Sequence, residues 1–239
     1  PQYYPTDGSN LDFYALHGNF APAFTEESTE FPTTAIVHSV EADQSGTDMK
    51  NYAKSDLLYA VKKGVTRSKD AVELTFYHML SKVEVVLKSG NGTPGLTGAA
   101  VTIVGTKLKA NFTPDKTKDI ADVSSGQSHR AGMITIPEDD NDATPIKIQT
   151  VTTTDFNTNS EYGEAVVLPK QTLNADDSFI QVKLKDNAVF TYKIPAGGLT
   201  LESGKKYTYK ITVNQTGLTV TSEIEDWTEE AKEGDAVMD

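Results

Sequence analysis

Three glycines in the segment VEVVLKSGNGTPGLTGAAVTIVG have a spacing that could do chemistry. Gly90, Gly92 and Gly95 show the G-x-G-x-x-G spacing of a dinucleotide-binding loop, and they follow an apolar run. Such a loop holds phosphate only where a helix begins directly after it, because the first helical amides receive the anion. Here Pro94 interrupts the loop and a short β-branched run follows. We therefore expect a hairpin connection in which Gly and Asn supply positive φ angles.

Clustered carboxylates are the next candidates. Residues 138–142 (EDDND) offer hard oxygen ligands for calcium, but they lack the spacing and the glycine of an EF-hand, which favours a solvated loop. Glu225 and Asp226 stand beside Trp227 and are candidates for a sugar-hydrolysing pair. Adjacent residues of a strand point to opposite faces, so we do not expect these two carboxylates to share acid and base work.

Histidines are isolated in the sequence. None is part of an H-x-H or H-E-x-x-H pattern for a metal, and they are His17, His38, His78 and His129. In LTFYHML, period-two spacing would place His78 on one strand face with Leu74 and Phe76. We expect a hydrogen-bonded, structural His78 in or beside the core.

No other constellation points to catalysis. The G-x-S-x-G nucleophile elbow does not occur in the sequence, which favours a scaffold without a cofactor over an enzyme. Tyr3, Tyr4, Phe13 and Tyr14 could stack on a sugar, although packing of alternate members in a core explains them as well.

Composition narrows the class of protein further. The chain has 239 residues, 37% of them hydrophobic, and a net charge of -12, which repels nucleic acid at long range. Cysteine is absent, so disulfides, thiolate metal sites and cysteine nucleophiles are excluded. No apolar run approaches the roughly 18 residues of a membrane span. The chain opens with PQYYPTDGSN, so we expect any export signal or lipid anchor to lie upstream of it.

The elements that would position these residues are strands. Apolar residues recur with period two and no run shows helical spacing, which predicts an all-β fold. Two segments carry the pattern most clearly. Their inward faces are expected to be Tyr207, Tyr209, Ile211 and Val213 in YTYKITV, and Ile180, Val182 and Leu184 in FIQVKL.

The pattern predicts two groups of strands. The first group comprises residues 11–16, 35–40, 56–61, 72–77, 80–88, 99–105 and 107–112. The second comprises residues 130–136, 145–152, 163–168, 178–184, 187–194, 204–213 and 217–225, with hairpin tips at LKDNAVF and VNQTGLTV. About seven strands suit one two-sheet sandwich. The polar segment 113–128 is the expected linker, so two domains are predicted, over residues 1–114 and 115–239.

Five motifs together resemble the Mfa-like fimbrillin family of Bacteroidales. In chain order they are YYPTDGSNLDFYAL, SDLLYA, VELTFYHMLSKVEVVL, VVLPKQTL and SGKKYTYKITVNQTGLTVTSEIEDW. The resemblance implies two tandem transthyretin-like β-sandwich domains in a subunit of a type V pilus. It also implies export as a lipoprotein and display on the outer membrane or in an extracellular fimbria.

The resemblance implies a mode of assembly and structural residues. In the family a protease, often cutting after Arg, removes the first strand, and a terminal strand of a neighbouring subunit fills the groove; this is donor-strand exchange. The family strand L-x-F-x-H-x-L-S-K-V matches Leu74, Phe76, His78, Leu80, Ser81, Lys82 and Val83, which continues to Val85 and Leu87, and is expected to pack the N-terminal sandwich. The last strand, LTVTSEIEDW, ends at Trp227 and is expected to close the C-terminal sandwich beside the strand of Tyr207 to Val213.

Two features depart from the family pattern. Arg67 lies between predicted strands, well inside the first domain, so we do not expect it to be the maturation site. After Trp227 the segment TEEAKEGDAVMD offers too little apolar alternation for a donor strand, in which each buried Val or Leu would contribute about 1.5–3 kcal/mol. An upstream region or a rearranged edge would then supply the polymerising contact, or the subunit would end the fibre.

Three functions remain open from the sequence. The first is a structural fimbrial subunit, in the stalk or as an accessory or tip protein, whose partners are other subunits. The second is a surface adhesin that binds glycans or proteins through loops near residues 152–163, with Phe156 and Tyr162 exposed. The third, an enzyme, has no residues in its favour.

Overall fold

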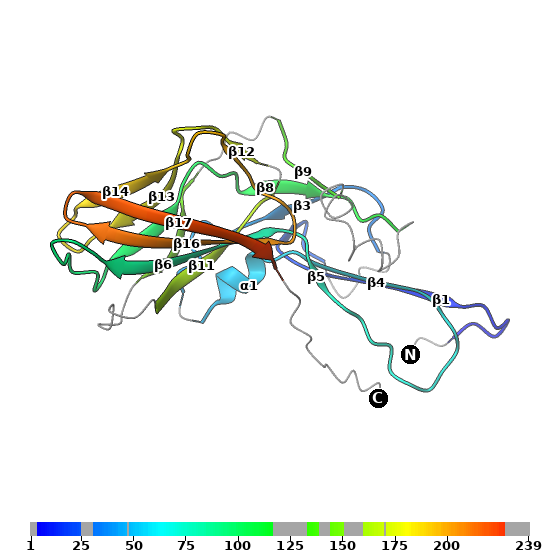
Figure 1. Ribbon diagram of the computed structural model, residues 1–239. Helices are drawn as coiled ribbons and strands as arrows, with labels where there is room; N and C mark the ends of the chain where they lie inside the picture. The colour runs from blue at the N-terminus through cyan, green and yellow to red at the C-terminus, as the bar shows by residue number, and fades with distance from the viewer. Residues whose placement is uncertain are drawn as a thin grey trace.

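The computed structural model describes residues 4–24, 31–46, 48–116, 133–138, 144–150, 160–169 and 171–227. Strands dominate this part of the chain, and the helix α1 (Lys50–Ser55) is the one α-helix within it (Figure 1). The prediction of an all-β fold is therefore confirmed. The same residues contain no helix with the length and apolar character that a membrane crossing needs.

Two sheets form the N-terminal part of the molecule. Their strand orders are β1-β4-β5 and β2-β3-β8-β9. The strands are β1 (Leu11–His17), β2 (Phe20–Ala21), β3 (Ile36–Ser39), β4 (Leu58–Val65), β5 (Tyr77–His78), β8 (Lys109–Phe112) and β9 (Ile134–Thr135). The ring of Tyr59 on β4 packs edge-on against Phe112 on β8, with centroids 5.9 Å apart. Both side chains are buried, so this contact joins the two sheets.

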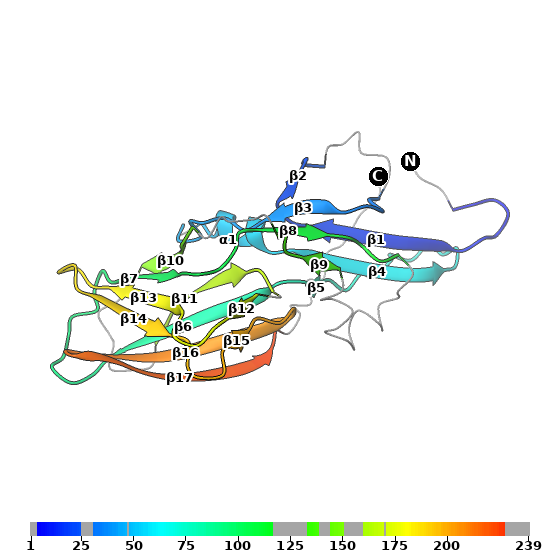
Figure 2. The same cartoon turned by 90° about the horizontal axis from the view of Figure 1, so that it is seen from above.

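Two larger sheets form what we call the C-terminal sandwich. Their orders are β10-β7-β13-β14 and β11-β6-β16-β17, and Figure 2 shows them as two layers. The strands are β6 (Ser81–Ser89), β7 (Ala100–Ile103), β10 (Ile146–Thr150), β11 (Ser160–Val167), β13 (Ser178–Lys183), β14 (Val189–Lys193), β16 (Lys205–Asn214) and β17 (Gly217–Asp226). A small pair, β12 (Thr172–Leu173) with β15 (Leu199–Thr200), completes the part of the chain that the structure describes.

Strand pairing does not follow the expected boundary at residue 114. β6 runs parallel to β16, from the pair Lys82 and Lys206 to the pair Ser89 and Val213. β7 likewise pairs with β10 and β13. Strands from both sides of residue 114 thus share both sheets of the C-terminal sandwich. Reasoning from sequence groups neighbours along the chain, whereas these pairings join segments that are distant in sequence.

The alternation in β16 is observed as predicted. Its inward residues Tyr207, Tyr209, Ile211 and Val213 are all buried, and Lys210 on the other face is exposed. The predicted inward residues of the segment around β13 are buried too, namely Ile180, Val182 and Leu184. β-Branched and aromatic side chains pack well on a pleated surface, which explains why these segments form strands.

Both predicted hairpins form. β13 and β14 pair antiparallel around a turn in which Asn187 has a φ of 70°. β16 and β17 pair over their full lengths, from Lys205 with Asp226 to Asn214 with Gly217. Two residues therefore close the second hairpin, which is the commonest loop length for such a turn.

The predicted strand over residues 72–77 is wrong. Only Tyr77 and His78 are in a strand, β5, and the residues before them form none. Phe76 is 37% exposed and Leu74 is half-buried, whereas Tyr77 is buried. The expected shared face of Leu74, Phe76 and His78 fails because period-two alternation holds only within a strand.

Leu80, Val83, Val85 and Leu87 are buried, as expected of structural residues. The last three belong to β6, however, and therefore pack the C-terminal sandwich and not the N-terminal sheets. One continuous hydrophobic core includes side chains of all four large sheets. The two parts of the molecule are thus joined by apolar packing.

Several predictions fall on residues outside the described ranges. They concern Tyr3, His129, most of the linker 113–128, residues 139–142 of the acidic run, residues 152–159 of the proposed recognition loops and the segment after Trp227.

Candidate functional site

The glycine segment crosses between the two layers of the C-terminal sandwich. It joins β6 to β7, which belong to different sheets, so the connection is a crossover and the expected hairpin is wrong. Gly92 has a φ of 81°, the left-handed conformation that glycine tolerates. A side chain at Gly90 would collide with the side chain of Asn214. No helix follows, so the segment lacks the anion-binding amides of a phosphate loop.

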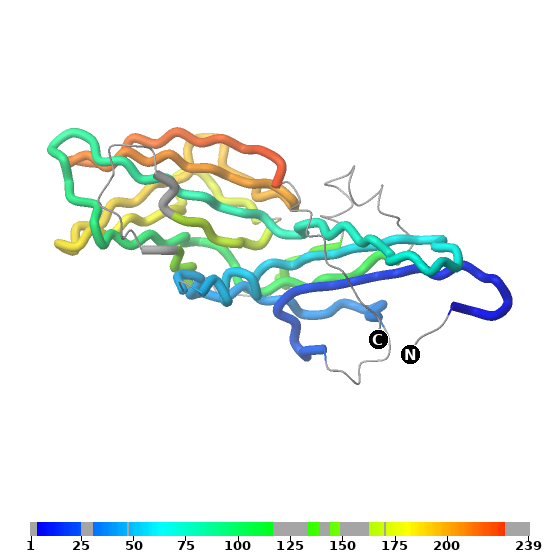
Figure 3. Tube along the Cα trace, turned by 90° about the horizontal axis from the view of Figure 1, so that it is seen from below, coloured from blue at the N-terminus to red at the C-terminus, as the bar shows by residue number. Residues whose placement is uncertain are grey.

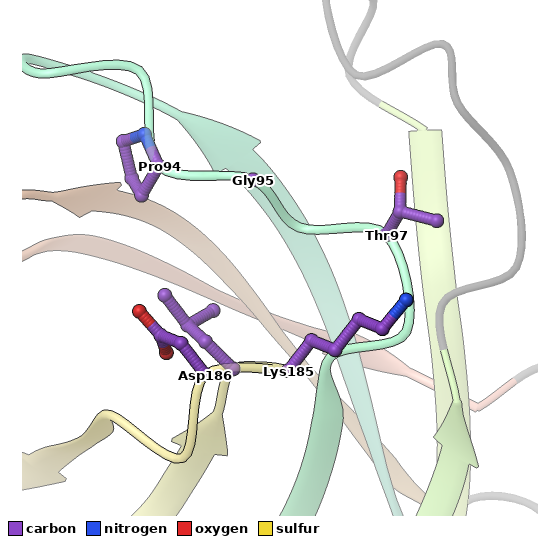
Figure 4. Close-up of a pocket in the computed structure, with 6 residues that line it drawn as sticks. Pro94, Gly95, Thr97, Lys185 and Asp186 are labelled. Atoms are coloured by element: carbon purple, nitrogen blue, oxygen red, sulfur yellow. The ribbon is translucent and has the colours of Figure 1, made fainter.

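A shallow pocket of about 500 Å³ lies where this crossover meets the β13–β14 turn (Figure 4). It is lined by Pro94, Gly95, Thr97, Leu184, Lys185 and Asp186. In Figure 4 the Lys185 side chain extends toward Thr97, whereas Asp186 lies on the side of Pro94. One carboxylate oxygen of Asp186 already accepts the Ala188 N–H at 3.0 Å. The pocket therefore brings no acid and base together.

Glu225 and Asp226 do not form a catalytic pair. Glu225 binds Lys206 at 2.7 Å, and this hydrogen bond lowers the pKa of its carboxyl. Asp226 binds a different lysine, Lys205, at 2.8 Å. The two carboxylates thus serve two separate ion pairs, as the opposite faces of a strand require. Among the described residues no group of three or more His, Asp or Glu side chains is arranged to hold a metal.

Two histidines bind the backbone beside α1. The buried ring of His38 accepts the Asn19 N–H at Nδ1 and donates from Nε2 to the Ser55 carbonyl, at 3.2 and 2.9 Å. Burial lowers the pKa of His38 to about 4, so the ring is neutral at pH 7. His17 contacts the Asp56 carbonyl through Nδ1 at 3.0 Å. Both histidines have structural roles.

His78 has a hydrogen-bonded ring, as the sequence suggested, but it does not share a strand face with Leu74 and Phe76. Its Nδ1 lies 2.9 Å from the Asp56 carboxylate, and its ring stacks on Trp227 with centroids 3.7 Å apart. Lys82 lies 5.5 Å above the same indole ring. The backbone N–H of Trp227 donates to the Gly204 carbonyl. This cluster fixes the end of β17 against the N-terminal sheets.

One long side of the C-terminal sandwich is covered, and we call it the sealed side. Its edge strands are β10 and β11. Along β10, the Lys147 N–H donates to the Ala42 carbonyl at 2.7 Å, and the Gln44 N–H donates to the Lys147 carbonyl at 2.9 Å. Along β11, the Gln44 side-chain amide both donates to the Val166 carbonyl and accepts the Val166 N–H, each at 2.9 Å. Residues 42–44 thus cover both edges.

The covering segment is itself anchored. Glu41 donates its N–H to the hydroxyl of Ser55, at the end of α1, at 2.8 Å. Ser55 in turn receives the bond from His38, and Lys54 binds Glu41 at 2.7 Å. Gln44 is only 1% exposed, so its amide is a buried group whose hydrogen bonds cannot be replaced by water. These contacts of α1 hold the segment against β10 and β11.

The opposite long side, which we call the open side, ends in the strands β14 and β17 (Figure 1). Within the described residues no further strand pairs with either edge. Val189 on β14 is 54% exposed and Ile224 on β17 is 56% exposed. Ile224 lies opposite buried Tyr207 and so on the inward face of its sheet, where an apolar residue would ordinarily be covered.

A third edge lies in the N-terminal part of the molecule. Figure 3 shows β1 running beside β4 along the border of its sheet. Its inward residues Tyr14 and Leu16 are half-buried and pack against the core. Tyr14 contacts Phe31, with ring centroids 5.3 Å apart. The nearby buried hydroxyl of Tyr59 has no hydrogen-bond partner among the described residues.

The described part of the molecule therefore has open sheet edges, which are groups that an added strand can bond. Comparison with known proteins agrees with this geometry: a family model described as fimbrillin-like matches residues 1–227. The chain belongs to the fimbrillin-like family.

Similar proteins come from Bacteroides. This fimbrillin-like chain is 25% identical over 232 residues to a protein of Bacteroides uniformis that is provisionally named fimbrium subunit Fim1C, and it spans 95% of its own length and 64% of that protein's length.

Two solved structures share the fold. One, provisionally described as a cell adhesion protein of Bacteroides uniformis, has a TM-score of 0.65 at 21% identity and covers 95% of this chain and 77% of its own. The other, from Bacteroides ovatus, has the same description and a TM-score of 0.63 at 20% identity. The match covers 93% of this chain and 70% of the Bacteroides ovatus chain.

Sequence reasoning missed the residues that decide which edges are open. Gln44 lies in EADQSGTD, a polar segment without alternation, and nothing in it indicates contact with Val166. Asp56, the partner of His78, follows α1, a six-residue helix that is too short to show a helical period. The length of β17 and its exposed Ile224 could have been read from the sequence as signs of an edge strand.

Proposed function

We propose that this fimbrillin-like chain is a subunit of a cell-surface fimbria and that it assembles with other subunits by donor-strand exchange. Membership of the family supports the first part, and so does the printed name of the Bacteroides uniformis relative. The second part rests on β1, which pairs with β4 on one edge and, among the described residues, with no strand on the other, and whose inward side chains are only half-buried. Export as a lipoprotein and anchoring in the outer membrane belong to the same proposal.

The edge of β1 is the proposed acceptor. A strand from a neighbouring subunit would bond the backbone of β1 and cover Tyr14 and Leu16, which gains main-chain hydrogen bonds and apolar burial together. The same strand would approach the aromatic cluster of Tyr14, Phe31 and Tyr59. An added polar group there could also pair with the unpartnered hydroxyl of Tyr59.

Leu16→Lys tests this proposal, because an inward-pointing charge on an edge strand blocks strand addition. In a host that makes the remaining fimbrial subunits, we expect the variant to reach the surface but to be missing from fibres seen by electron microscopy. Phe13→Glu, on the outward face opposite Lys62, is the matched control and should assemble normally. Normal incorporation of a folded Leu16→Lys chain would overturn the proposal.

The donor strand is proposed to come from outside residues 228–239, since that segment has little apolar alternation. A chain that ends at residue 227 should therefore still be incorporated into fibres. If this truncation alone abolished incorporation while the chain remained folded, the C-terminal segment would be the donor, and this part of the proposal would fail.

A second candidate function is adhesion, which the descriptions of the two solved structures favour. In that case the chain would sit at the fibre tip and bind a glycan or a surface protein. Saturable binding of the monomer on a glycan array would support adhesion. A flat array together with fibre incorporation along the shaft would leave the structural role.

A further inference from the structure

We propose that β17 of one molecule pairs antiparallel with β17 of a second copy, about a two-fold axis that passes through Ser222. This side-by-side contact is separate from strand addition at β1 and would link molecules or fibres laterally. Two four-stranded sheets, each of the order β11-β6-β16-β17, would then join edge to edge into one continuous sheet.

The backbone of β17 is arranged for such a contact. In an antiparallel ladder, hydrogen-bonded pairs recur at every second residue. The Trp227 N–H donates to the Gly204 carbonyl just beyond the ladder of β16 and β17, so the odd-numbered residues of β17 bond to β16. Leu218, Val220, Ser222 and Ile224 consequently direct their N–H and C=O groups to the open side.

The side chains of β17 complement their own sequence when it runs in reverse. With Ser222 on the axis, Ile224 faces the partner's Val220 on the inward surface. On the outward surface, Glu223 faces the partner's Thr221 and Glu225 faces the partner's Thr219. Moving the axis to residue 223 would set the two Glu223 carboxylates against each other, which is unfavourable. The sequence thus favours the axis at Ser222 over that register.

The charges of the edge permit a second copy despite the net charge of the chain. Glu223 lies 3.5 Å from Lys210 and Glu225 lies 2.7 Å from Lys206, all within one molecule. The acidic outward side chains of β17 therefore arrive already paired with cations. Ile224, 56% exposed in one molecule, would gain an apolar neighbour on the inward face.

The devices that usually prevent edge pairing are missing from the middle of this strand. Edge strands are commonly kept apart by proline, by a bulge or by a charge that points inward. β17 pairs with β16 over ten residues without a register shift and contains no proline. Its one inward charge, Asp226, lies at the end of the strand and is bonded to Lys205 at 2.8 Å, so the inward residues nearest the axis are Leu218, Val220, Ser222 and Ile224. A symmetric pair is the closed assembly that a self-complementary edge forms.

Disulfide trapping tests the register directly, because the chain has no cysteine of its own. In Ser222→Cys the two sulfurs meet across the axis, where the Cα separation of about 5.5 Å suits a disulfide. We expect most of the purified variant to become a covalent dimer on mild oxidation. Thr219→Cys, whose copies lie apart in this register, should remain monomeric under the same conditions. Equal crosslinking of the two variants, or none, would overturn the proposal.

Sedimentation velocity of the full chain gives an independent measure without crosslinking. Wild type should show a concentration-dependent dimer. Ile224→Lys should weaken it by about tenfold or more, since a charge on the inward face of an edge strand opposes pairing. Thr219→Lys should tighten it by about threefold at low salt, because the new lysine faces the partner's Glu225. A wild-type monomer at all concentrations would sink the proposal.

A failure of the β17 dimer proposal can be distinguished from a failure of the proposed fimbrial function. The β17 variants are assayed on purified chain, where no other subunit is present, whereas Leu16→Lys is assayed in fibres. A second copy bound elsewhere would give a dimer that Ile224→Lys does not weaken, and that result would also reject the β17 contact.

Discussion

Both long sides of the C-terminal sandwich end in edge strands, but one side is covered by another segment of the chain and the other is open. On the sealed side, the backbone of residues 42–44 bonds to Lys147 on β10, and the amide of Gln44 bonds to Val166 on β11. On the open side, β14 and β17 end the sheets, and Ile224 remains exposed on an inward face. One long side of the sandwich is thus covered by a segment of the same chain, whereas the described residues leave the edge strands of the other side free to accept a strand.

The sealed side also connects the two parts of the molecule. The segment that covers it comes from between β3 and β4, whereas the strands that it covers belong to the C-terminal sandwich. The contact that covers the sealed side therefore also contributes to the joining of the two parts. On the open side, the N-terminal sheets are contacted at the end of β17, where Trp227 stacks on His78.

The largest expected loss of stability comes from a substitution on an inner strand, β16, in contrast to the edge strand β17. Ile211→Ala on β16 removes a fully buried side chain between the layers and should lower the free energy of unfolding by about 3–4 kcal/mol. Urea denaturation followed by circular dichroism measures it. A loss below about 1 kcal/mol would mean that the layers are not packed as described.

Acid should loosen the sealed side through His38. Its folded pKa of about 4 lies below the ordinary value of 6.5, because burial disfavours the charged ring. The unfolded chain therefore binds this proton first, and the stability due to neutral His38, which is complete above pH 6.5, is lost as the pH falls toward 4. The loss is about 3 kcal/mol, and Asp56 and His17 nearby modify it in opposite directions.

Denaturation curves at pH 7 and pH 4.5 provide this measurement. His38→Gln is the control, since glutamine can keep a donor and an acceptor but does not titrate. The variant should lose less stability than wild type over this interval. Equal losses in the two proteins would show that His38 does not control the sealed side.

Gln44→Ala removes the side-chain amide that covers the sealed side at β11, and it changes no residue of either sheet. It leaves the Val166 N–H and carbonyl without partners in a buried place, and it should cost about 2–3 kcal/mol. Asn51→Ala, which removes one exposed bond to the Asp43 carbonyl, is the matched control and should cost less than about 0.5 kcal/mol. If both variants cost the same small amount, the seal contributes nothing to stability.

Ile224→Ala gives the smallest expected effect and completes the comparison. Its side chain is more than half exposed in the single molecule, so the unfolding free energy measured in dilute solution should change by less than about 0.5 kcal/mol. A cost as large as that of Ile211→Ala would mean that Ile224 is covered and that the open side is not open.

Much of the fold follows from local pattern. The sequence pattern located β16, β17, β13 and β14, and in β16 the side-chain period agrees with the burial of Tyr207, Tyr209, Ile211 and Val213. It failed at Phe76, where a strand of two residues is too short for alternation to fix which side chains are buried. It also could not assign β6 to its sheet, since parallel pairing with β16 depends on contacts distant in sequence.

The candidate site was less accessible to sequence reasoning than the fold. The resemblance of several motifs led to the family, and edge strands followed from it in general terms. Which edges are closed depends on Gln44 and on backbone groups of residues 42–44, and backbone hydrogen bonds leave no mark in residue type. The stacking of His78 on Trp227 likewise joins two segments that sequence spacing does not relate.

Residue-level hydrogen exchange of the dilute chain by nuclear magnetic resonance tests the difference between the two sides most directly. We expect slow exchange at the Lys147 and Val166 amides, which bond to the covering segment. We expect fast exchange at the amides of Ser222 and Ile224, which face the open side. Thr221, bonded toward β16, should be slow. Equal protection of Ser222, Ile224 and Val166 in the monomer would contradict the account.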